Sequence, residues 1–240
     1  MCMSYSGRCL LSNFMVGRDA NRGSCTHPCR WKYSLVEEKR PGEYYPVEED
    51  NRGSYIMNSR DLCMLDKLPD LIDAGISSLK IEGRMKSPFY VATVVSAYRA
   101  ALDEYLEDPD NYTFQEKWYK ELCKASHREF YHGFYYSKPD SSGQNYSSSD
   151  YTREYSFIGV VRGYEPDSGL TIVEQRNKFC VGEDIEVFGP RTDYTDEIVR
   201  EMYDGNNNPI ESAPHPQQII KVKLSKTYPS DFILRKKKES

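Results

Sequence analysis

The pattern of apolar and polar positions divides the chain into three stretches. Residues 1–106 combine two segments of helical periodicity with one short apolar run. Residues 107–153 begin with a polar helix and end in a Tyr- and Ser-rich linker, and residues 154–240 contain short β-branched runs separated by turns. Periods of 3.6 and 2 residues indicate helix and strand. We therefore predict an α/β plus β chain, in which a small β-barrel domain follows an α/β part.

The first stretch begins with a Gly-rich loop and continues as helix, strand and helix. Apolar residues recur at helical spacing up to Gly75, after a helix cap at Asn58 or Ser59. Residues 76–83, ISSLKIEG, form the expected short buried strand, and a second helix follows Ser87 as its N-cap. Strand, loop and capped helix is the repeating unit of a parallel sheet or a (β/α) barrel. One such unit cannot close a barrel by itself.

The third stretch shows the pattern of a small β-domain. Its β-branched runs are separated by turns rich in Gly, Pro, Asn and Asp. The expected strands are 155–164, 170–177, 183–189, 197–204 and 218–224. Strands this short and this evenly spaced predict a compact barrel. The closing run RKKKE is expected to be a solvated tail, with RNA contact as the alternative.

Composition indicates a globular chain that folds around a core. The chain has 240 residues, 38% of them hydrophobic, and a mean hydropathy of -0.73. It contains no run near the roughly 20 apolar residues that a membrane helix needs. It also has no basic-then-apolar leader before the first cysteine. We expect a cytoplasmic protein that makes no membrane contact.

The net charge of -5 means that any nucleic acid would bind a local basic patch. Residues 1–30 contain such a patch, with four arginines against the single acidic residue Asp19. The arginines are Arg8, Arg18, Arg22 and Arg30. Trp31 and Tyr33 follow and offer surfaces on which an unpaired RNA base can stack. Packing of Trp31 in the core is an equally good interpretation.

Seven cysteines make an odd total in a chain without a leader. They are Cys2, Cys9, Cys25, Cys29, Cys63, Cys123 and Cys180. In a reducing compartment this favours metal binding or burial over a disulfide framework. Cys123 and Cys180 each lie alone in apolar or β context, where cysteine acts as a small hydrophobe.

The other five cysteines are spaced too irregularly for a typical zinc site. Structural zinc sites show two close CxxC-like pairs, and this chain has no second one. Iron-sulfur clusters accept scattered thiolates when loops of low steric bulk wrap them, and Gly7, Gly17 and Gly23 lie between the cysteines. From spacing alone an iron-sulfur cluster, a zinc site and buried free thiols all stay open.

Three runs of the sequence resemble the peptidase U32 family, the collagenase-like proteases. They are CMSYSGRCLLSNFMVGRDANRGSCTHPCRWKY, SLKIEGRMKSPFYVATVVSAYR and SHREFYHGFYY. Together they extend to about residue 137, and the β-rich remainder is similar to the family's C-terminal barrel. The resemblance implies the C-terminal part of a (β/α) barrel followed by a small β-barrel, within a longer protein. The branch it most resembles hydroxylates the wobble uridine of tRNA.

The resemblance also implies a 4Fe-4S cluster. Carried over to this chain, its ligands are Cys2, Cys9, Cys25 and Cys63. Cys29 is the alternative to Cys25 as the third thiolate. With four thiolates no iron keeps an open position, so electron transfer or a structural clamp is the simplest role. The implied partners are tRNA, a small carboxylate donor and a related U32 subunit. Prephenate is the implied co-substrate, and an oxygen-dependent route is the alternative.

Lys80, Glu82 and Arg84 are the expected catalytic residues. They lie at the end of the expected strand 76–83, where parallel α/β folds place ligands, and before a helix N-terminus that favours an anion. Lys80 and Glu82, two residues apart on a strand, would point to one face. They and Lys86 would hold a carboxylate donor or an RNA phosphate. The alternative is an ordinary salt-bridged strand end.

Two other classes of function stay open. A peptidase needs an activated nucleophile or an open metal site, and neither a triad pattern nor HExxH is present. His27 lies between Cys25 and Cys29, which leaves a Cys-His dyad as an alternative. His127 and His132 are better explained as packed or solvated side chains than as zinc ligands. The third class is a non-catalytic module for RNA binding or assembly.

Overall fold

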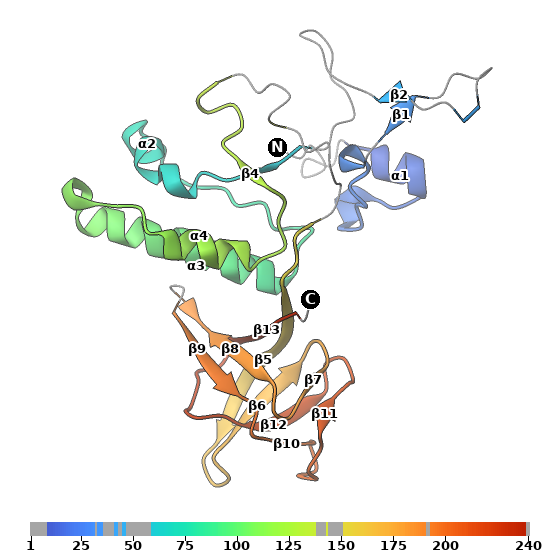
Figure 1. Ribbon diagram of the computed structural model, residues 1–240, viewed down its shortest axis with the longest axis vertical. Helices are drawn as coiled ribbons and strands as arrows, with labels where there is room; N and C mark the ends of the chain where they lie inside the picture. The colour runs from blue at the N-terminus through green and yellow to red at the C-terminus, as the bar shows by residue number, and fades with distance from the viewer. Residues whose placement is uncertain are drawn as a thin grey trace. The chain divides into compact units, whose positions relative to one another are not determined.

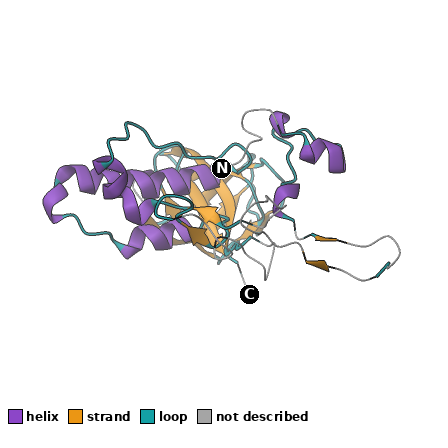
Figure 2. Ribbon diagram, turned by 90° about the horizontal axis from the view of Figure 1, so that it is seen from above, coloured by secondary structure: helices purple, strands orange, loops and turns teal. Residues whose placement is uncertain are grey.

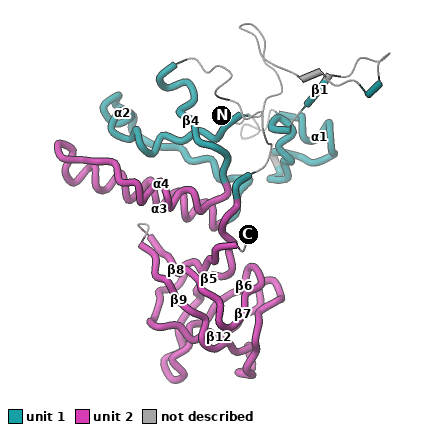
Figure 3. The backbone as a smooth tube through the Cα atoms, viewed as in Figure 1, with its two compact units in different colours: residues 1–87, 127–152 teal, residues 88–126, 153–240 magenta. Residues whose placement is uncertain are grey.

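The computed structural model describes residues 9–31, 33–35, 41–42, 45–46, 59–137, 143, 151–190 and 193–238. The chain forms two compact units (Figure 3). Unit 1 comprises residues 1–87 and 127–152, and unit 2 comprises residues 88–126 and 153–240. These boundaries fall at other positions than those expected from the pattern, and the division at 106 and 153 stays a prediction. Cys2, Arg8 and Asn58 lie outside the described residues.

Unit 1 consists of short elements joined by long loops. Its helices are α1 (Leu11–Val16), α2 (Leu68–Asp73) and the 3-10 turns η2 (Ala20–Arg22), η3 (Pro28–Arg30) and η4 (Leu65–Lys67). Its strands are β1 (Ser34–Leu35), β2 (Tyr45–Pro46), β3 (Asp61–Leu62) and β4 (Phe130–Tyr131). β1 and β2 pair antiparallel, whereas β3 and β4 pair in parallel. The parallel pair brings together segments that lie far apart in the sequence.

Two predictions for unit 1 are wrong. Residues 76–83 form no strand, and most of their side chains are exposed. The preceding helix begins at Leu68, because Pro69 is confined to the first helical turn by its fixed φ and missing N–H. Ser59 therefore caps no helix and lies in a bridge beside β3. Strand β3 pairs with β4, 69 residues further along the chain. This pairing decides the structure of residues 61–62, although the surrounding sequence has the apolar spacing of a helix.

Unit 2 begins with two helices that run side by side (Figure 1 and Figure 2). They are α3 (Pro88–Glu107) and α4 (Glu116–Cys123), connected through the 3-10 turn η5 (Pro109–Asn111). The predicted start of α3 after Ser87 is confirmed. Trp118 is 1% exposed and stacks on Tyr112, with ring centroids 6.0 Å apart. Although most residues of α4 are polar, the helix buries the face that carries Trp118.

A seven-stranded antiparallel sheet forms the rest of unit 2. Its strands are β5 (Tyr155–Glu165), β6 (Leu170–Gln175), β8 (Asp184–Phe188), β9 (Tyr194–Ile198), β10 (Glu201–Tyr203), β12 (Ile219–Lys223) and β13 (Ile233–Lys237), in the order β10-β12-β6-β5-β13-β8-β9. β7 (Phe179–Cys180) pairs separately with β11 (Ser212–Ala213). The edge strands β9 and β10 follow one another in the chain, joined by Val199 and Arg200. The sheet therefore curls into a half-barrel.

Four of the five expected strands are confirmed as single strands, and the fifth is divided. The run 197–204 splits between β9 and β10 at Val199, which is fully buried. Apolar side chains from strands across the whole sheet fill one core, among them Met202 of β10, Val173 of β6 and Ile185 of β8. At the start of α3, Phe89 packs against Phe188 and Ile233 of the same unit. The helices and the sheet of unit 2 therefore share buried surface.

The prediction of a solvated basic tail is wrong. Residues 235–237 belong to β13, and the Arg235 side chain is fully buried. Its guanidinium pairs with the carboxylates of Glu121 on α4 and Glu186 on β8. The basic sequence RKKKE does not indicate these partners, because Glu121 and Glu186 lie 114 and 49 residues from Arg235 in the sequence. Within the described part of the chain, every helix is too short or too polar to span a bilayer.

Candidate functional site

The described cysteines of the proposed ligand set all lie in unit 1. Cys9 and Cys25 are half-buried, Cys29 is exposed, and Cys63 is 5% exposed. Among the described residues, no three or more His, Cys, Asp or Glu side chains are grouped so that they could hold a metal ion. The structure thus does not bring Cys9, Cys25 and Cys63 together, and Cys2 lies outside its description. The four-cysteine set stays a prediction.

The loop from Cys25 to Cys29, which we call the cysteine loop, donates a backbone hydrogen bond to the sulfur of Cys25. His27 adopts a left-handed φ of 56°, uncommon for a residue other than glycine. Its backbone N–H donates to Cys25 Sγ at 3.3 Å. Such hydrogen bonds stabilise a thiolate and tune the properties of metal-bound sulfur. The choice between Cys25 and Cys29 as the third ligand stays a prediction, and Cys25 is the sulfur that receives this backbone hydrogen bond.

The same loop is held by side chains on both sides of it. Ser12 of α1 bonds Thr26 through their hydroxyls at 3.2 Å, and Trp31 Nε1 donates to the Thr26 carbonyl at 3.1 Å. Trp31 is half-buried and stacks with Tyr33, at a centroid distance of 6.3 Å. Trp31 is therefore partly packed, as a core residue would be, and partly accessible, as a stacking surface would be.

A polar cluster ties this loop to strand β3. Arg30 Nη1 lies 3.2 Å from Asp61 Oδ1 and 2.6 Å from the Tyr151 hydroxyl. The other Asp61 oxygen accepts the backbone N–H of Arg128 at 3.0 Å, and the Arg128 guanidinium donates to the Arg30 carbonyl at 3.3 Å. Lys86 Nζ lies 4.1 Å from the centroid of the Tyr151 ring. We call these five residues, Arg30, Asp61, Lys86, Arg128 and Tyr151, the Asp61 cluster.

The Asp61 cluster has an excess of positive charge. It combines three cations with one carboxylate, and Arg128 is only 3% exposed. Burial lowers the pKa of the nearby His27 imidazole, and the three cations of the cluster lower it further, against the opposing charge of Asp61. His27 is therefore neutral at pH 7. The arrangement can attract an anion to this side of unit 1.

The expected catalytic residues do not converge at a strand end. Lys80, Glu82 and Arg84 are exposed in an irregular segment, where Glu82 Oε1 accepts the backbone N–H of Arg84 at 3.2 Å. Because no strand forms here, the argument that placed Lys80 and Glu82 on one face no longer holds. Their functional role stays a prediction. Of this run, Lys86 is the residue that the structure places in the Asp61 cluster.

A second group of polar residues lies at the carboxyl ends of β3 and β4. Cys63 follows β3 and its backbone N–H bonds the Tyr131 carbonyl at 3.0 Å. His132 follows β4, and its Nε2 lies 3.0 Å from Asp66 Oδ1. Sequence reasoning named Cys63 as a ligand but missed its proximity in the fold to the His132–Asp66 contact, because the run from Phe130 onward was interpreted as a linker. Its aromatic run, FYHGFYY, was the available signal.

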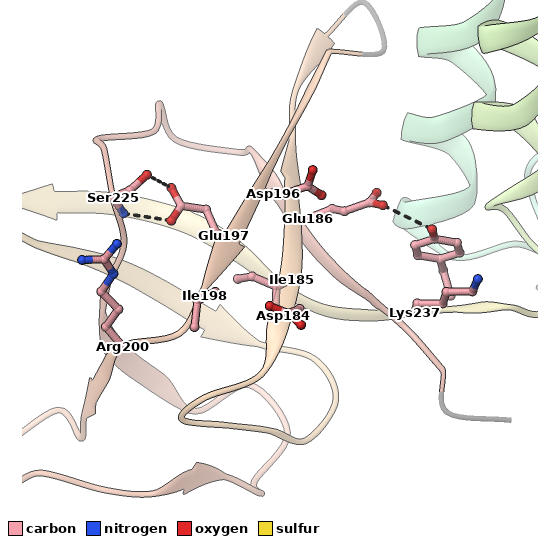
Figure 4. Close-up of a pocket in the computed structure, with 10 residues that line it drawn as sticks. Asp184, Ile185, Glu186, Asp196, Glu197, Ile198, Arg200, Ser225 and Lys237 are labelled. Atoms are coloured by element: carbon pink, nitrogen blue, oxygen red, sulfur yellow. Dashed lines mark hydrogen bonds between the residues drawn. The ribbon is translucent and has the colours of Figure 1, made fainter.

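Unit 2 contains an open hollow of about 560 Å³ beside β8 and β9 (Figure 4). Its lining includes Glu186 and Glu197. Glu197 accepts hydrogen bonds from the Ser225 backbone at 2.9 Å and from the Tyr228 hydroxyl at 2.6 Å. Glu186 accepts one from the Tyr155 hydroxyl at 3.2 Å. These carboxylates hold neighbouring strands together, so the hollow belongs to the structural framework of the sheet.

Family models match nearly the whole chain. The model described as peptidase family U32 matches residues 1–145, and the one described as the peptidase family U32 C-terminal domain matches residues 153–235. The chain belongs to peptidase family U32. Both the cysteine loop and the carboxyl ends of β3 and β4 lie within the first U32 match, and the curled sheet corresponds to the second.

Several U32 relatives are named for tRNA hydroxylation. The chain is 40% identical over 238 residues to "tRNA hydroxylation protein P1" of Bacillus subtilis, covering 99% of this chain and 56% of the relative. It is 34% identical over 234 residues to "tRNA hydroxylation protein P" of Escherichia coli, covering 80% of this chain and 50% of the relative. A "Collagenase" of Porphyromonas gingivalis is 31% identical, covering 98% of this chain and 56% of the relative. The chain thus spans about half the length of these curated relatives.

A solved structure matches about a third of the chain. It is the C-terminal domain of a putative U32 peptidase from Geobacillus thermoleovorans, at 34% sequence identity and a TM-score of 0.32. The match covers 34% of this chain and 99% of that one.

Proposed function

We propose that this chain is part of a tRNA hydroxylation protein. The supporting observation is its identity of 40%, over 99% of its length, to a U32 protein of that name. The relatives named collagenase are less similar, at 31% and 30% identity. In this proposal the substrate is a wobble uridine of tRNA and the protein acts in the cytoplasm. Residues 1–106 are then the C-terminal part of a (β/α) barrel, and residues 154–240 form its small β-barrel domain.

The proposed cofactor is a 4Fe-4S cluster on Cys2, Cys9, Cys25 and Cys63. The donor type fits, since cluster irons are held by cysteine thiolates. The hydrogen bond to Cys25 and the Arg30–Asp61 contact support it, because the first favours a thiolate and the second holds the loop near the strand that precedes Cys63. When bound, the cluster would supply electron transfer or a structural clamp. The described cysteine positions do not yet form a metal-binding group.

The protein's own residues would bind and orient the reactants. Hydroxylation of a uracil ring carbon is a two-electron oxidation, so it needs both an oxygen donor and an electron acceptor. We propose prephenate, a small carboxylate, as a co-substrate of this reaction, with an oxygen-dependent route as the alternative. The excess positive charge of the Asp61 cluster supports binding of such an anion, with Lys80, Glu82 and Arg84 as further contacts. Holding base and donor together in a site without bulk water is the protein's main contribution. A related U32 subunit is the proposed protein partner.

The decisive experiment measures the modified nucleoside in cells. The full-length gene and any U32 paralogue are deleted, and tRNA nucleosides are quantified by mass spectrometry. We expect 5-hydroxyuridine to disappear and to return when the wild-type gene is restored. An unchanged level in the strain that lacks every U32 gene would refute the proposal.

A peptidase is the second candidate, because the chain is 31% identical over 98% of its length to a relative named collagenase. The full-length protein is incubated with denatured collagen in chelator-treated buffer. We expect no cleavage. Cleavage that is lost in Cys25→Ala and kept in Cys123→Ala would favour the peptidase.

A further inference from the structure

The turn after β4 exposes three aromatic side chains in succession. Phe134, Tyr135 and Tyr136 are 80%, 57% and 55% exposed. Large aromatic side chains dominate cores and interfaces, where their apolar surface is buried. Three neighbouring ones at the surface leave much apolar area in water and indicate a contact with another molecule.

The structure holds this turn in place at both ends. His132 Nε2 lies 3.0 Å from one oxygen of Asp66 and 3.2 Å from the other. The Tyr136 hydroxyl donates a hydrogen bond to Asp70 of α2. These two contacts fix the turn against the helical segment that follows β3. The aromatic rings are therefore displayed on an anchored backbone.

Gly133 brings the turn close to β3. It has a φ of 64°, and a Cβ at this position would lie 3.0 Å from Leu62 Cδ1. The backbone N–H of Tyr135 also bonds the His132 carbonyl at 3.4 Å. Both features tighten the turn over the end of β3. Aromatic side chains presented on such a rigid turn lose little entropy when a ligand binds.

The turn lies at the carboxyl ends of the parallel strands β3 and β4. Ligands of parallel α/β sheets bind at this edge. Cys63, a proposed cluster ligand, follows β3 at the same edge. A molecule stacked on the turn would thus lie on the side of unit 1 where the proposed chemistry takes place.

We propose that Phe134 and Tyr135, on this anchored turn, form a stacking surface for an unpaired base of the RNA substrate. The proposal rests on the proposed tRNA function. Every base has a π-face, and stacking on exposed aromatic rings is the usual way in which proteins hold unpaired RNA bases. The two carboxylates beside the turn, Asp66 and Asp70, are each held by contacts within unit 1. Asp66 is paired with His132 and with Lys67, and the Asp70 contact raises the pKa of Tyr136 to about 12, so that its hydroxyl stays neutral.

The test measures RNA affinity in the full-length protein. Binding of an unmodified tRNA transcript is compared among wild type, Phe134→Ala, Phe134→Trp and Phe14→Ala. Phe14 of α1 is a matched control, because it is 87% exposed and lies in the same unit outside the turn. We expect Phe134→Ala to bind about 5- to 150-fold more weakly, as loss of one base stack predicts. Phe134→Trp and Phe14→Ala should stay within about twofold of wild type.

Photocrosslinking locates the base directly. A short RNA that contains 5-bromouridine is irradiated with the wild-type protein, and the crosslinked peptide is identified by mass spectrometry. We expect the crosslink at Phe134 or Tyr135. Equal unfolding midpoints for wild type and Phe134→Ala confirm that the substitution leaves the fold intact, and Phe134→Trp tests stacking independently of it.

The outcomes separate this proposal from the proposed function. Unchanged affinity in Phe134→Ala, with crosslinks elsewhere, would overturn the stacking surface even if the gene restores 5-hydroxyuridine. Unchanged RNA affinity together with lost binding of a U32 partner subunit would make the turn a protein contact. A wild-type protein that neither binds tRNA nor restores the nucleoside would refute both proposals.

Discussion

Arg30 and Asp61, 31 residues apart in the sequence, form an ion pair with Nη1 and Oδ1 3.2 Å apart. Arg30 directly follows the cysteine loop, and Asp61 begins the strand that leads to Cys63. Both side chains are mostly buried, at 22% and 16% exposure. This pair therefore fixes one cysteine-bearing segment relative to another.

Substitution Asp61→Ala should destabilise the full-length protein by about 1–3 kcal/mol, because it leaves buried donors of Arg30 and Arg128 without their acceptor. Denaturant unfolding followed by circular dichroism measures the loss. The control is Asp103→Ala, which removes a more exposed pair with Arg99 within α3. It should cost less than about 1 kcal/mol. Equal effects of both substitutions would contradict the role assigned to Asp61.

Arg235 should be among the most sensitive positions of unit 2. Its Nε lies 2.7 Å from Glu186 and its Nη2 lies 2.9 Å from Glu121. Arg235→Met leaves these two carboxylates to share a single cation, Lys124, so we expect a loss of about 3–5 kcal/mol in unfolding free energy. Lys236→Met, which breaks a more exposed pair with Glu183, should cost less than about 1 kcal/mol.

A double substitution tests the origin of that loss. Arg235→Met combined with Glu121→Leu should recover part of the stability, because one uncompensated carboxylate is removed with its partner. Unfolding free energies of both single variants and the double variant complete the cycle. Simple additivity of the two losses would show that packing of the arginine, and not its charge, is what matters.

Stability should fall when the pH drops below about 4.5. Burial opposes ionisation of Glu186 and Glu197, but hydrogen bonds to each outweigh burial, so the pKa of both lies below the ordinary 4.5 of a glutamate. A lowered pKa in the folded state adds stability above the unfolded value, and this is lost as the pH falls through the folded one. Urea unfolding between pH 7 and pH 3 measures the slope.

Single substitutions test whether the Glu197 carboxylate causes the loss of stability at low pH. Glu197→Gln should flatten the pH dependence, since the amide cannot titrate, while Asp167→Asn at an exposed turn should keep the wild-type profile. The hydrogen bonds from Ser225 and Tyr228 are the main stabilising contacts of the Glu197 carboxylate. A Glu197→Gln profile identical to wild type would rule out this carboxylate as a source of the slope.

The cysteine loop predicts which thiol is essential for the proposed cluster. The full-length protein is purified without oxygen, and its iron and sulfide are quantified. We expect Cys25→Ser to lose the iron, because Cys25 belongs to the proposed ligand set and its sulfur accepts a hydrogen bond from the His27 backbone. Cys29→Ser, at an exposed sulfur, and Cys123→Ser, in the other unit, should keep it. The reverse result for Cys25 and Cys29 would transfer the ligand role to Cys29.

Local patterns were sufficient where neighbours in sequence decide the structure. Helix α3 begins at Pro88 because a proline after Ser87 is a strong local start signal. The strands of unit 2 follow from β-branched runs between turns. The same approach failed at 76–83, because an apolar run becomes a strand only when another strand is available to pair with it.

The sequence by itself determined the U32 resemblance, the start of α3, the strands β5, β6, β8 and β12, and the candidate cysteines, since each depends on residues close together along the chain. The tertiary structure decided the parallel pairing of β3 with β4, the contacts of Asp61 and the burial of Arg235. The partners of these residues lie 31 to 114 positions away in the sequence, and no local sequence pattern encodes contacts over such separations. Burial then removes the charged groups from water, so only a structure with matching partners can accommodate them.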